Sequence, residues 1–195
     1  MTFDQVIARI RRALMLDESV FAEVREDVSF TLFSIGCTAI GVLLAAIGAW
    51  LWADTVLSST PDGWFMDTVV LGTIFTTVLM IIGVIVMYFI LSQAFAEKIQ
   101  VDAFLRVAAL AHLPFALGLL IFIPEIGFAL GLAAIIATFH YVVFAIRAAY
   151  PDIGPKRVIL AVLIGFAVWA VVLPLISGYP DNNWATGIFV YSLSD

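Results

Sequence analysis

The sequence predicts an all-α, polytopic membrane helical bundle with five transmembrane helices and an amphipathic N-terminal helical segment. Three observations predict this fold class. Apolar residues make up 64% of the chain and charged residues only 12%, which is far from the composition of a soluble domain of this length. The apolar residues gather in five runs, each long enough for a membrane-spanning helix. All lysines and arginines fall on one side of the arrangement that these runs produce.

The five runs divide the chain into three parts. Residues 1–28 form the N-terminal cytoplasmic or interfacial segment, residues 29–177 hold the spans, and residues 178–195 form an external tail that is too short to cross again. The first run is longer than about twenty residues, so we expect a spanning helix and no cleaved signal peptide. The five spans are expected over residues 29–53, 65–95, 103–122, 126–149 and 158–176.

The N-terminal segment opens with a predicted amphipathic helix over residues 3–14. Its apolar residues recur at helical spacing, whereas Arg9 and Arg12 lie off that stripe. Such a helix would lie in the membrane interface with its arginines as anchors at the head groups. The pattern fits equally well a helix packed against the protein's own spans. A second short helix, SVFAEVRED, is expected next, capped by Asp17 or Ser19.

Small residues recur at spacings of four on three of the spans. They are Gly41, Ala45 and Ala49 on the first span, Gly127 and Gly131 on the fourth, and Ala161 and Gly165 on the fifth. Such faces allow two helix backbones to approach closely. Together they offer more contact surface than one five-helix bundle needs for itself. We therefore expect association with other integral membrane proteins, or self-association, in addition to contact with membrane lipids.

Aromatic and basic residues at the span ends are expected to act as interface anchors. Trp50 and Trp52 mark the outer end of the first span, and Arg147 and Tyr150 mark the inner end of the fourth. Their amphipathic side chains suit the head-group region of a bilayer.

The two histidines are the only polar side chains of the spans that suggest ligand chemistry. His112 precedes Pro114, which should kink the third span just after it. At 1.5 Å per residue, His112 and His140 both lie roughly 14 Å from the same end of the bundle. Facing each other, they would share a metal ion or bind a haem or chlorin. We favour internal hydrogen bonding of each histidine instead, and expect no cofactor and no metal.

The distribution of charge orients the predicted bundle. All nine basic residues fall on the N-terminal side: Arg9, Arg11, Arg12, Arg25, Lys98, Arg106, Arg147, Lys156 and Arg157. The opposite side carries only acids, which are Asp54, Asp62, Asp67, Glu125, Asp181 and Asp195. The positive-inside rule then predicts a cytoplasmic N-terminus and an external C-terminus. We expect a prokaryotic plasma membrane protein.

Motifs of catalysis are missing from the sequence. It contains no glycine-rich phosphate loop, no CxxC and no paired histidines at helical spacing. The single cysteine, Cys37, excludes an internal disulfide framework. No ionisable carboxylate or base falls in mid-membrane, where a proton relay or ion path would place one. We therefore predict that the protein is not an enzyme, and nothing indicates a nucleic-acid partner.

Several short motifs resemble the Yip-domain family of five-span membrane proteins. They are ALMLDESVFAEVRED before the first span, DAFLRVAALAHLPFALGLL in the third, the IPEIG turn, and VVFAIRAAY followed by GPKRVILAVLIGF. The resemblance extends from about Val20 to Ile176. It implies the five-span fold. Eukaryotic members are named for interacting with Ypt/Rab GTPases in early secretory traffic, through a long cytosolic region that this chain lacks, so GTPase binding is not expected here.

These observations predict a non-enzymatic scaffold or accessory subunit of Yip-domain type, which associates with other membrane proteins through its small-residue helix faces. A small-molecule or ion transporter is the first alternative. A haem- or chlorin-binding subunit using His112 and His140 is the second.

Overall fold

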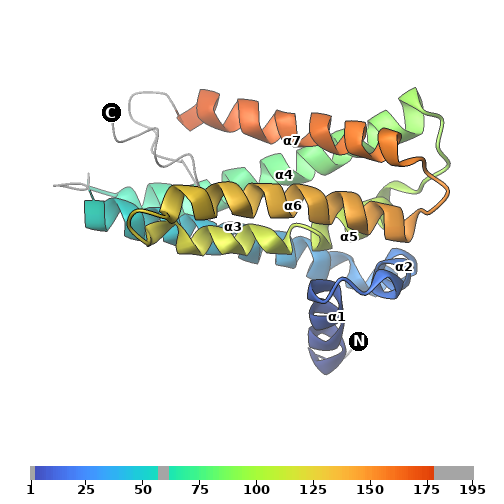
Figure 1. Ribbon diagram of the computed structural model, residues 1–195, viewed down its shortest axis with the longest axis horizontal. Coiled ribbons are helices and arrows are strands. Elements are labelled where there is room, and N and C mark those ends of the chain that lie inside the picture. Colours follow the sequence, from blue (N-terminus) through green and yellow to red (C-terminus); the bar gives the residue numbers. More distant parts are fainter. Residues whose placement is uncertain (1–2, 57–61, 178–195) are drawn as a thin grey trace.

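The computed structural model describes residues 3–56 and 62–177, and this part of the chain is all-α (Figure 1). The elements are the α-helices α1 (Phe3–Leu14), α2 (Glu18–Glu26), α3 (Thr31–Val56), α4 (Gly72–Phe89), α5 (Val101–Leu110), α6 (Gly127–Ala149) and α7 (Pro155–Ser177). Two 3₁₀ segments, η1 (Val28–Phe30) and η4 (Leu113–Phe122), and two π-helical segments, η2 (Met66–Leu71) and η3 (Ile90–Ala94), extend or connect them.

Five helical segments of the described residues are long and apolar enough to cross a membrane, which confirms the predicted polytopic bundle. They cover Val28–Thr55, Met66–Ala94, Val101–Phe122, Gly127–Ala149 and Pro155–Leu175. The predicted ranges agree closely because each span coincides with an unbroken apolar run, and the runs end at charged or turn residues. The predicted tail over residues 178–195 lies outside the described residues.

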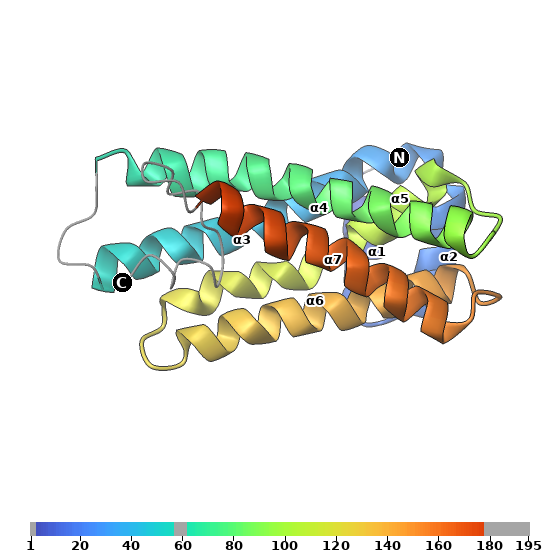
Figure 2. The same cartoon turned by 90° about the horizontal axis from the view of Figure 1, so that it is seen from above.

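The spans lie side by side along the length of the molecule, and α1 and α2 lie together at one end (Figures 1 and 2). The connections from α4 to α5 and from α6 to α7 are found at the same end, whereas the turn from η4 to α6 is at the other. The elements at the first end carry all nine basic residues of the chain. We call it the basic end, and the opposite end the far end.

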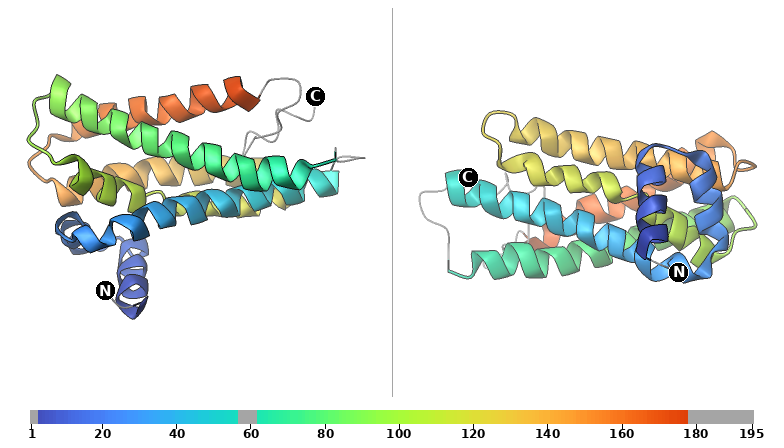
Figure 3. Two further views of the ribbon diagram at one scale, coloured as in Figure 1. Left: turned by 180° about the vertical axis from the view of Figure 1, so that it is seen from behind. Right: turned by 90° about the horizontal axis from the view of Figure 1, so that it is seen from below.

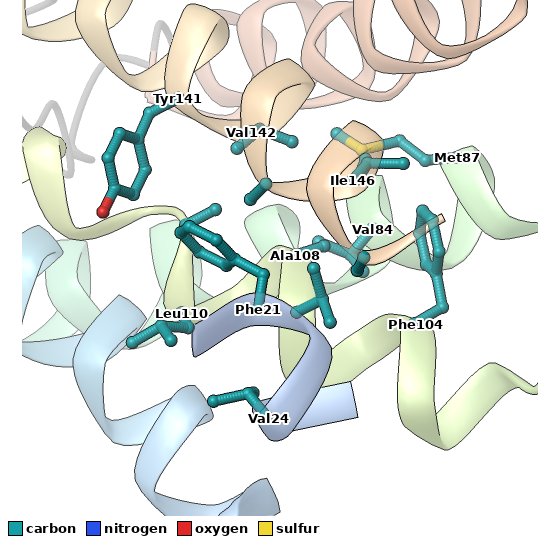
Figure 4. Close-up of a cluster of buried hydrophobic side chains, with 14 of the residues drawn as sticks. Phe21, Val24, Val84, Met87, Phe104, Ala108, Leu110, Tyr141, Val142 and Ile146 are labelled. Atoms are coloured by element: carbon teal, nitrogen blue, oxygen red, sulfur yellow. The ribbon is translucent and has the colours of Figure 1, made fainter. Parts of the chain in front are cut away.

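The helix α1 projects sideways from the long helices, and α2 lies crosswise against the side of the bundle near the basic end, next to α5 and α6 (Figure 3). Three side chains of α2, Val20, Phe21 and Val24, are completely buried. Phe21 and Val24 reach into the main core cluster near Leu110 and Tyr141 (Figure 4). The ring of Phe21 meets that of Tyr141 edge to face, with centroids 5.9 Å apart. The core of the bundle therefore includes the N-terminal segment.

The third span is broken in its middle. Its α-helical half ends at Leu110, and from Leu113 it continues as a 3₁₀ helix. The break confirms the predicted interruption before Pro114, which has no N–H for the helical ladder. Side chains bind two carbonyls at the break: His112 Nδ1 donates to that of Ala108 at 2.7 Å, and Thr38 Oγ1 donates to that of Ala109 at 2.8 Å, which also accepts the backbone N–H of His112. A membrane interior requires such internal partners, because it offers no water.

Candidate interfacial site

The small-residue face of α3 is buried within the bundle. A Cβ atom on Gly41 would lie 3.3 Å from the carbonyl oxygen of His112, at the break in the third span. Ala45 and Ala49 are completely buried. A Cβ atom on Gly118 would lie 2.6 Å from the Cβ atom of Ala45. This face packs on η4 and is not available to another protein, which corrects the expectation of a partner there.

The small residues of the fourth and fifth spans also face inward. Gly127, Gly131 and Ala161 are buried. A Cβ atom on Gly165 would lie 2.7 Å from the carbonyl oxygen of Gly83 on α4. In the folded chain these faces allow helices of the same bundle to pack closely. The approach of Gly165 on α7 to Gly83 on α4 is an example.

The closest helix contacts involve glycines that the spacing of four did not identify. A Cβ atom on Gly48 would lie only 2.3 Å from the carbonyl oxygen of Gly118. Gly48, Gly83 and Gly118 have no small residue four positions away on either side. Their role depends on what lies opposite them, so a pattern within one helix could not reveal it.

The two histidines do not form a shared site. His112 is only 2% exposed, and its ring stacks on Phe166 with centroids 5.9 Å apart. His140 is exposed, and its Nδ1 donates to the carbonyl of Ile136 at 2.8 Å. A haem, chlorin or metal ion held between them would require both rings to converge, and one is buried while the other points outward. The described residues also contain no group of three or more metal-binding His, Cys, Asp or Glu side chains.

Ion pairs connect α1 to α2 and to the residues beside it. Arg12 donates to both carboxylate oxygens of Glu23, at 2.8 and 2.9 Å, and to Asp17 at 2.8 Å. Arg9 lies 2.5 Å from Asp27. Both arginines were expected as anchors at the lipid head groups. The structure corrects this expectation, because their guanidinium groups form ion pairs with carboxylates of the same N-terminal segment. A bidentate arginine–carboxylate pair also restricts orientation.

The carboxylates of this network have lowered pKa values. The hydrogen bond from Arg12 lowers the pKa of Glu23. The hydroxyl of Ser19, followed by Arg12, lowers the pKa of Asp17. Hydrogen bonds to the ionised form favour that form, so the network is complete at neutral pH.

Arg106 joins α2 to the bundle from within. Its side chain is 2% exposed, yet its guanidinium donates to four partners, one of them the hydroxyl of Thr31 at 3.4 Å. Nη2 donates to the carbonyl of Arg25 at 2.6 Å, Nε to that of Val24 at 3.2 Å, and Nη1 to Asp102 at 3.0 Å. The two carbonyls belong to the last turn of α2, where the helix dipole favours a cation. Sequence reasoning counted Arg106 only as a charge, because its partners lie some eighty residues away.

Further contacts join α2 to the end of α6 at the basic end. Arg25 donates to the carbonyl of Ala149, the last residue of α6, and lies 5.3 Å from the ring centroid of Tyr150. Burial raises the pKa of Tyr150 to about 12. Tyr150 was expected as an interface anchor, but its ring packs within the protein between Arg25 and Phe104. Arg147, the other anchor expected there, is exposed.

The two tryptophans expected at the far interface differ in their surroundings. Trp50 is half-buried and meets Phe65 edge to face at 5.4 Å. Trp52 is 6% exposed and packs in a cluster with Trp64 and Ile121. Trp52 therefore contributes to packing of the far end and is not the interface anchor that its position predicted.

The outward surface of α1 and the residue that follows it carries a large apolar area, beside the exposed charged side chains of Asp4 and Arg11. Phe3, Ile7, Leu14 and Met15 are 75%, 49%, 57% and 66% exposed. Its polar face is engaged with α2 through Arg9 and Arg12, as described above. A helix that lies crosswise to the spans, with Arg9 and Arg12 paired to carboxylates and its apolar side chains exposed, fits the surface layer of a membrane. We call α1 and α2 together the platform.

A recess at the basic end has a volume of about 530 Å³ and lies between α2, residues 96–100 and the connection from α6 to α7. Charged side chains of both signs line it, including Arg25, Glu97 and Lys98. Its lining contains no Ser, Thr, Cys or His, but it carries the carboxylates of Glu26, Glu97 and Asp152.

Comparison of the chain with protein-family models, with curated proteins and with solved structures gave no match.

Proposed function

We propose that this protein is a non-enzymatic integral membrane scaffold or accessory subunit of the Yip-domain type, and that it acts through its platform. One observation carries the proposal. A bare apolar face on α1 is held in a defined orientation by ion pairs to α2, and α2 is held in turn by the buried guanidinium of Arg106. A fixed amphipathic surface at one membrane face suits the positioning of other membrane components.

The basic end is proposed to face the cytoplasm of a prokaryotic cell. The support is the location of every lysine and arginine at this end, since the positive-inside rule places such residues on the cytoplasmic side. The C-terminus then follows on the external side.

Solute transport is supported less well. A broken span in mid-membrane is a feature of many transporters, where it surrounds a substrate site. Here the cavity beside the His112 ring measures about 10 Å³, the space of roughly one water molecule. Phe166 and Trp169 line it together with Met80 and Met87. The larger recess next to Leu113 and Pro114, of about 480 Å³, is lined almost entirely by apolar side chains. Neither cavity offers the polar groups that a substrate site for an ion or a polar solute would need.

The proposed function is tested by changing the exposed face of α1. The double change Ile7→Gln and Leu14→Gln removes apolar contact without touching the ion pairs. Val101→Gln is the matched control, because Val101 is 47% exposed at the basic end but lies outside the platform. Native gels of gently solubilised membranes should show the unchanged protein and the control in complexes with other membrane proteins, and the double variant mostly alone.

The proposal fails if the unchanged protein migrates alone, or if the double variant keeps its complexes. It also fails if the purified protein by itself carries a solute across liposomes.

A further inference from the structure

A stripe of exposed side chains runs along the outer face of α6. Phe128, Leu132 and Ile136 are 54%, 43% and 49% exposed and recur every four residues. His140 and Arg147 continue this stripe toward the basic end and are exposed as well. On a spanning helix such a stripe faces lipid, so the apolar part meets acyl chains and the polar part lies toward the head groups.

The polar part of this stripe forms one wall of a recess with a volume of about 450 Å³. Glu18, in the first turn of α2, lines the recess together with His140 and Arg147 of α6. Val143, Phe144 and Ala148 add an apolar surface to it. The recess therefore has walls from two separate helices, and polar and apolar side chains are interspersed along its α6 wall.

Glu18 and Arg147 carry opposite charges that are not paired with any described residue of the protein. Neither side chain makes a hydrogen bond or an ion pair with any described residue. Most other charged groups of the platform are paired, as Arg12 is with Glu23. A free cation and a free carboxylate in one recess are complementary to a ligand that carries both charges.

We propose that this recess binds the head group of a phospholipid with a primary ammonium, such as phosphatidylethanolamine. Arg147 holds the phosphate, for which a guanidinium is well suited. Glu18 accepts hydrogen bonds from the ammonium. The acyl chains then run down α6 along Ile136 and Leu132.

The depth of His140 agrees with this placement. It lies seven residues from Arg147, which is about 10 Å along the helix and just below the ester groups when the phosphate is at Arg147. Its Nδ1 is already bonded to the carbonyl of Ile136, so only Nε2 remains for a ligand. His140 therefore marks the lower limit of the polar part.

The outer face of α1 provides a matched control. Asp4 and Arg11 also line one surface depression, and neither has an ion pair within the described residues. Its lining comes from α1 and from Met15, which directly follows that helix. Without a second helix it has no opposing wall, so it should not select a lipid by the structure of its head group.

The test is native mass spectrometry of the purified full chain, after incubation with phosphatidylethanolamine, phosphatidylcholine or phosphatidylglycerol of the same acyl chains. Phosphatidylethanolamine should be retained most strongly. Glu18→Gln and Arg147→Gln should each weaken that retention by about tenfold, the worth of one charge-assisted hydrogen bond. Asp4→Asn and Arg11→Gln should leave it unchanged. The thermal unfolding of all four variants should stay unchanged, because these side chains are exposed and unpaired.

Equal retention of the three lipids overturns the proposal, as does unchanged retention in Arg147→Gln. Unchanged retention in Glu18→Gln overturns it too, because the recess would then be a simple site for phosphate. These outcomes are independent of the complexes on which the proposed scaffold function depends.

Discussion

Both ends of the bundle have apolar packing, but they differ in the contacts that supplement it. At the basic end, arginines bind carboxylates and helix carbonyls, as Arg106 does with Val24 and Arg25. At the far end, Trp52, Trp64 and Ile121 pack together, and α3 approaches η4 at Gly48 and Gly118. Directed polar contacts fix an orientation, whereas close packing fixes a distance. The orientation of the platform and the integrity of the bundle should therefore be separable by mutation.

The largest effect is expected from Gly48→Ala in the packed region. The new methyl group would lie 2.3 Å from the carbonyl oxygen of Gly118, so α3 and η4 must move apart, at a cost of about 3 kcal/mol. Gly36→Ala on the same helix is the control, because nothing lies within 4 Å of its Cβ position. Reversible unfolding in mixed micelles measures both. Equal stability of the two variants would contradict the close approach of α3 and η4.

Removal of the buried guanidinium should have the next largest effect. Arg106→Leu leaves the carbonyls of Val24 and Arg25 without that donor, which should cost roughly 2–3 kcal/mol. The loss should appear mainly as detachment of the platform, detected by protease cleavage before residue 31 while the spans stay intact. Arg147→Leu, which removes an exposed arginine, should not increase cleavage. Similar cleavage of both variants would argue against the role assigned to Arg106.

Substitution of the two histidines should affect the stability of the bundle to different extents. His112→Ala removes the donor to the buried carbonyl of Ala108 and leaves space beside Phe166, which should destabilise the bundle by about 2 kcal/mol. His140→Ala changes an exposed side chain and should stay within about 0.5 kcal/mol of the unchanged protein. Thermal unfolding of the two variants provides the comparison. A larger effect at His140 would show that the burial of His112 is misassigned.

The smallest effect is expected from the ion pairs of the platform. The pKa values of Asp17 and Glu23 are lowered from ordinary values of 3.8 and 4.5. The stabilisation is therefore complete above those ordinary values and is lost as the pH falls through the lowered ones. A spin label at Ala8→Cys, in a Cys37→Ala background, should become more mobile below about pH 4, where the carboxylates begin to protonate.

At neutral pH, Arg12→Gln should reproduce that gain in mobility, and Arg11→Gln should not, because Arg11 has no ion pair in the described residues. Mobility that does not depend on pH, or on Arg12, would show that other contacts hold α1.

The spans and the concentration of basic residues at one end could be predicted because they depend on long stretches of chain. Hydropathy identifies a span without knowledge of its neighbours. The small-residue faces illustrate the limit of such patterns. Spacing identified Gly41 and Gly165 as contact residues, but only the fold determines whether a face meets another part of the same chain or a partner. The role of Gly48 also depends on the fold, because its partner Gly118 is seventy residues away.

The platform was partly predictable for the same reason. The apolar stripe of α1 is a local pattern, and so is the cap of α2, where the side chain of Asp17 accepts from the N–H of Ser19. The pattern allowed both an interfacial helix and a helix packed on the spans. The choice depends on contacts of Arg9 and Arg12 with α2 and Asp27, and of α2 with α5 and α6, which no local periodicity encodes.

The central claim is that the bare face of α1 lies in the membrane surface layer while α2 packs against the side of the bundle near the basic end. Bimane attached at Ile7→Cys or Ser19→Cys, in the Cys37→Ala background, tests it most directly in nanodiscs containing brominated lipids. The bimane at position 7 should be quenched strongly by bromine near the top of the acyl chains, and the one at position 19 should be nearly unaffected. Absence of quenching at position 7, or equal quenching at both positions, would contradict the account.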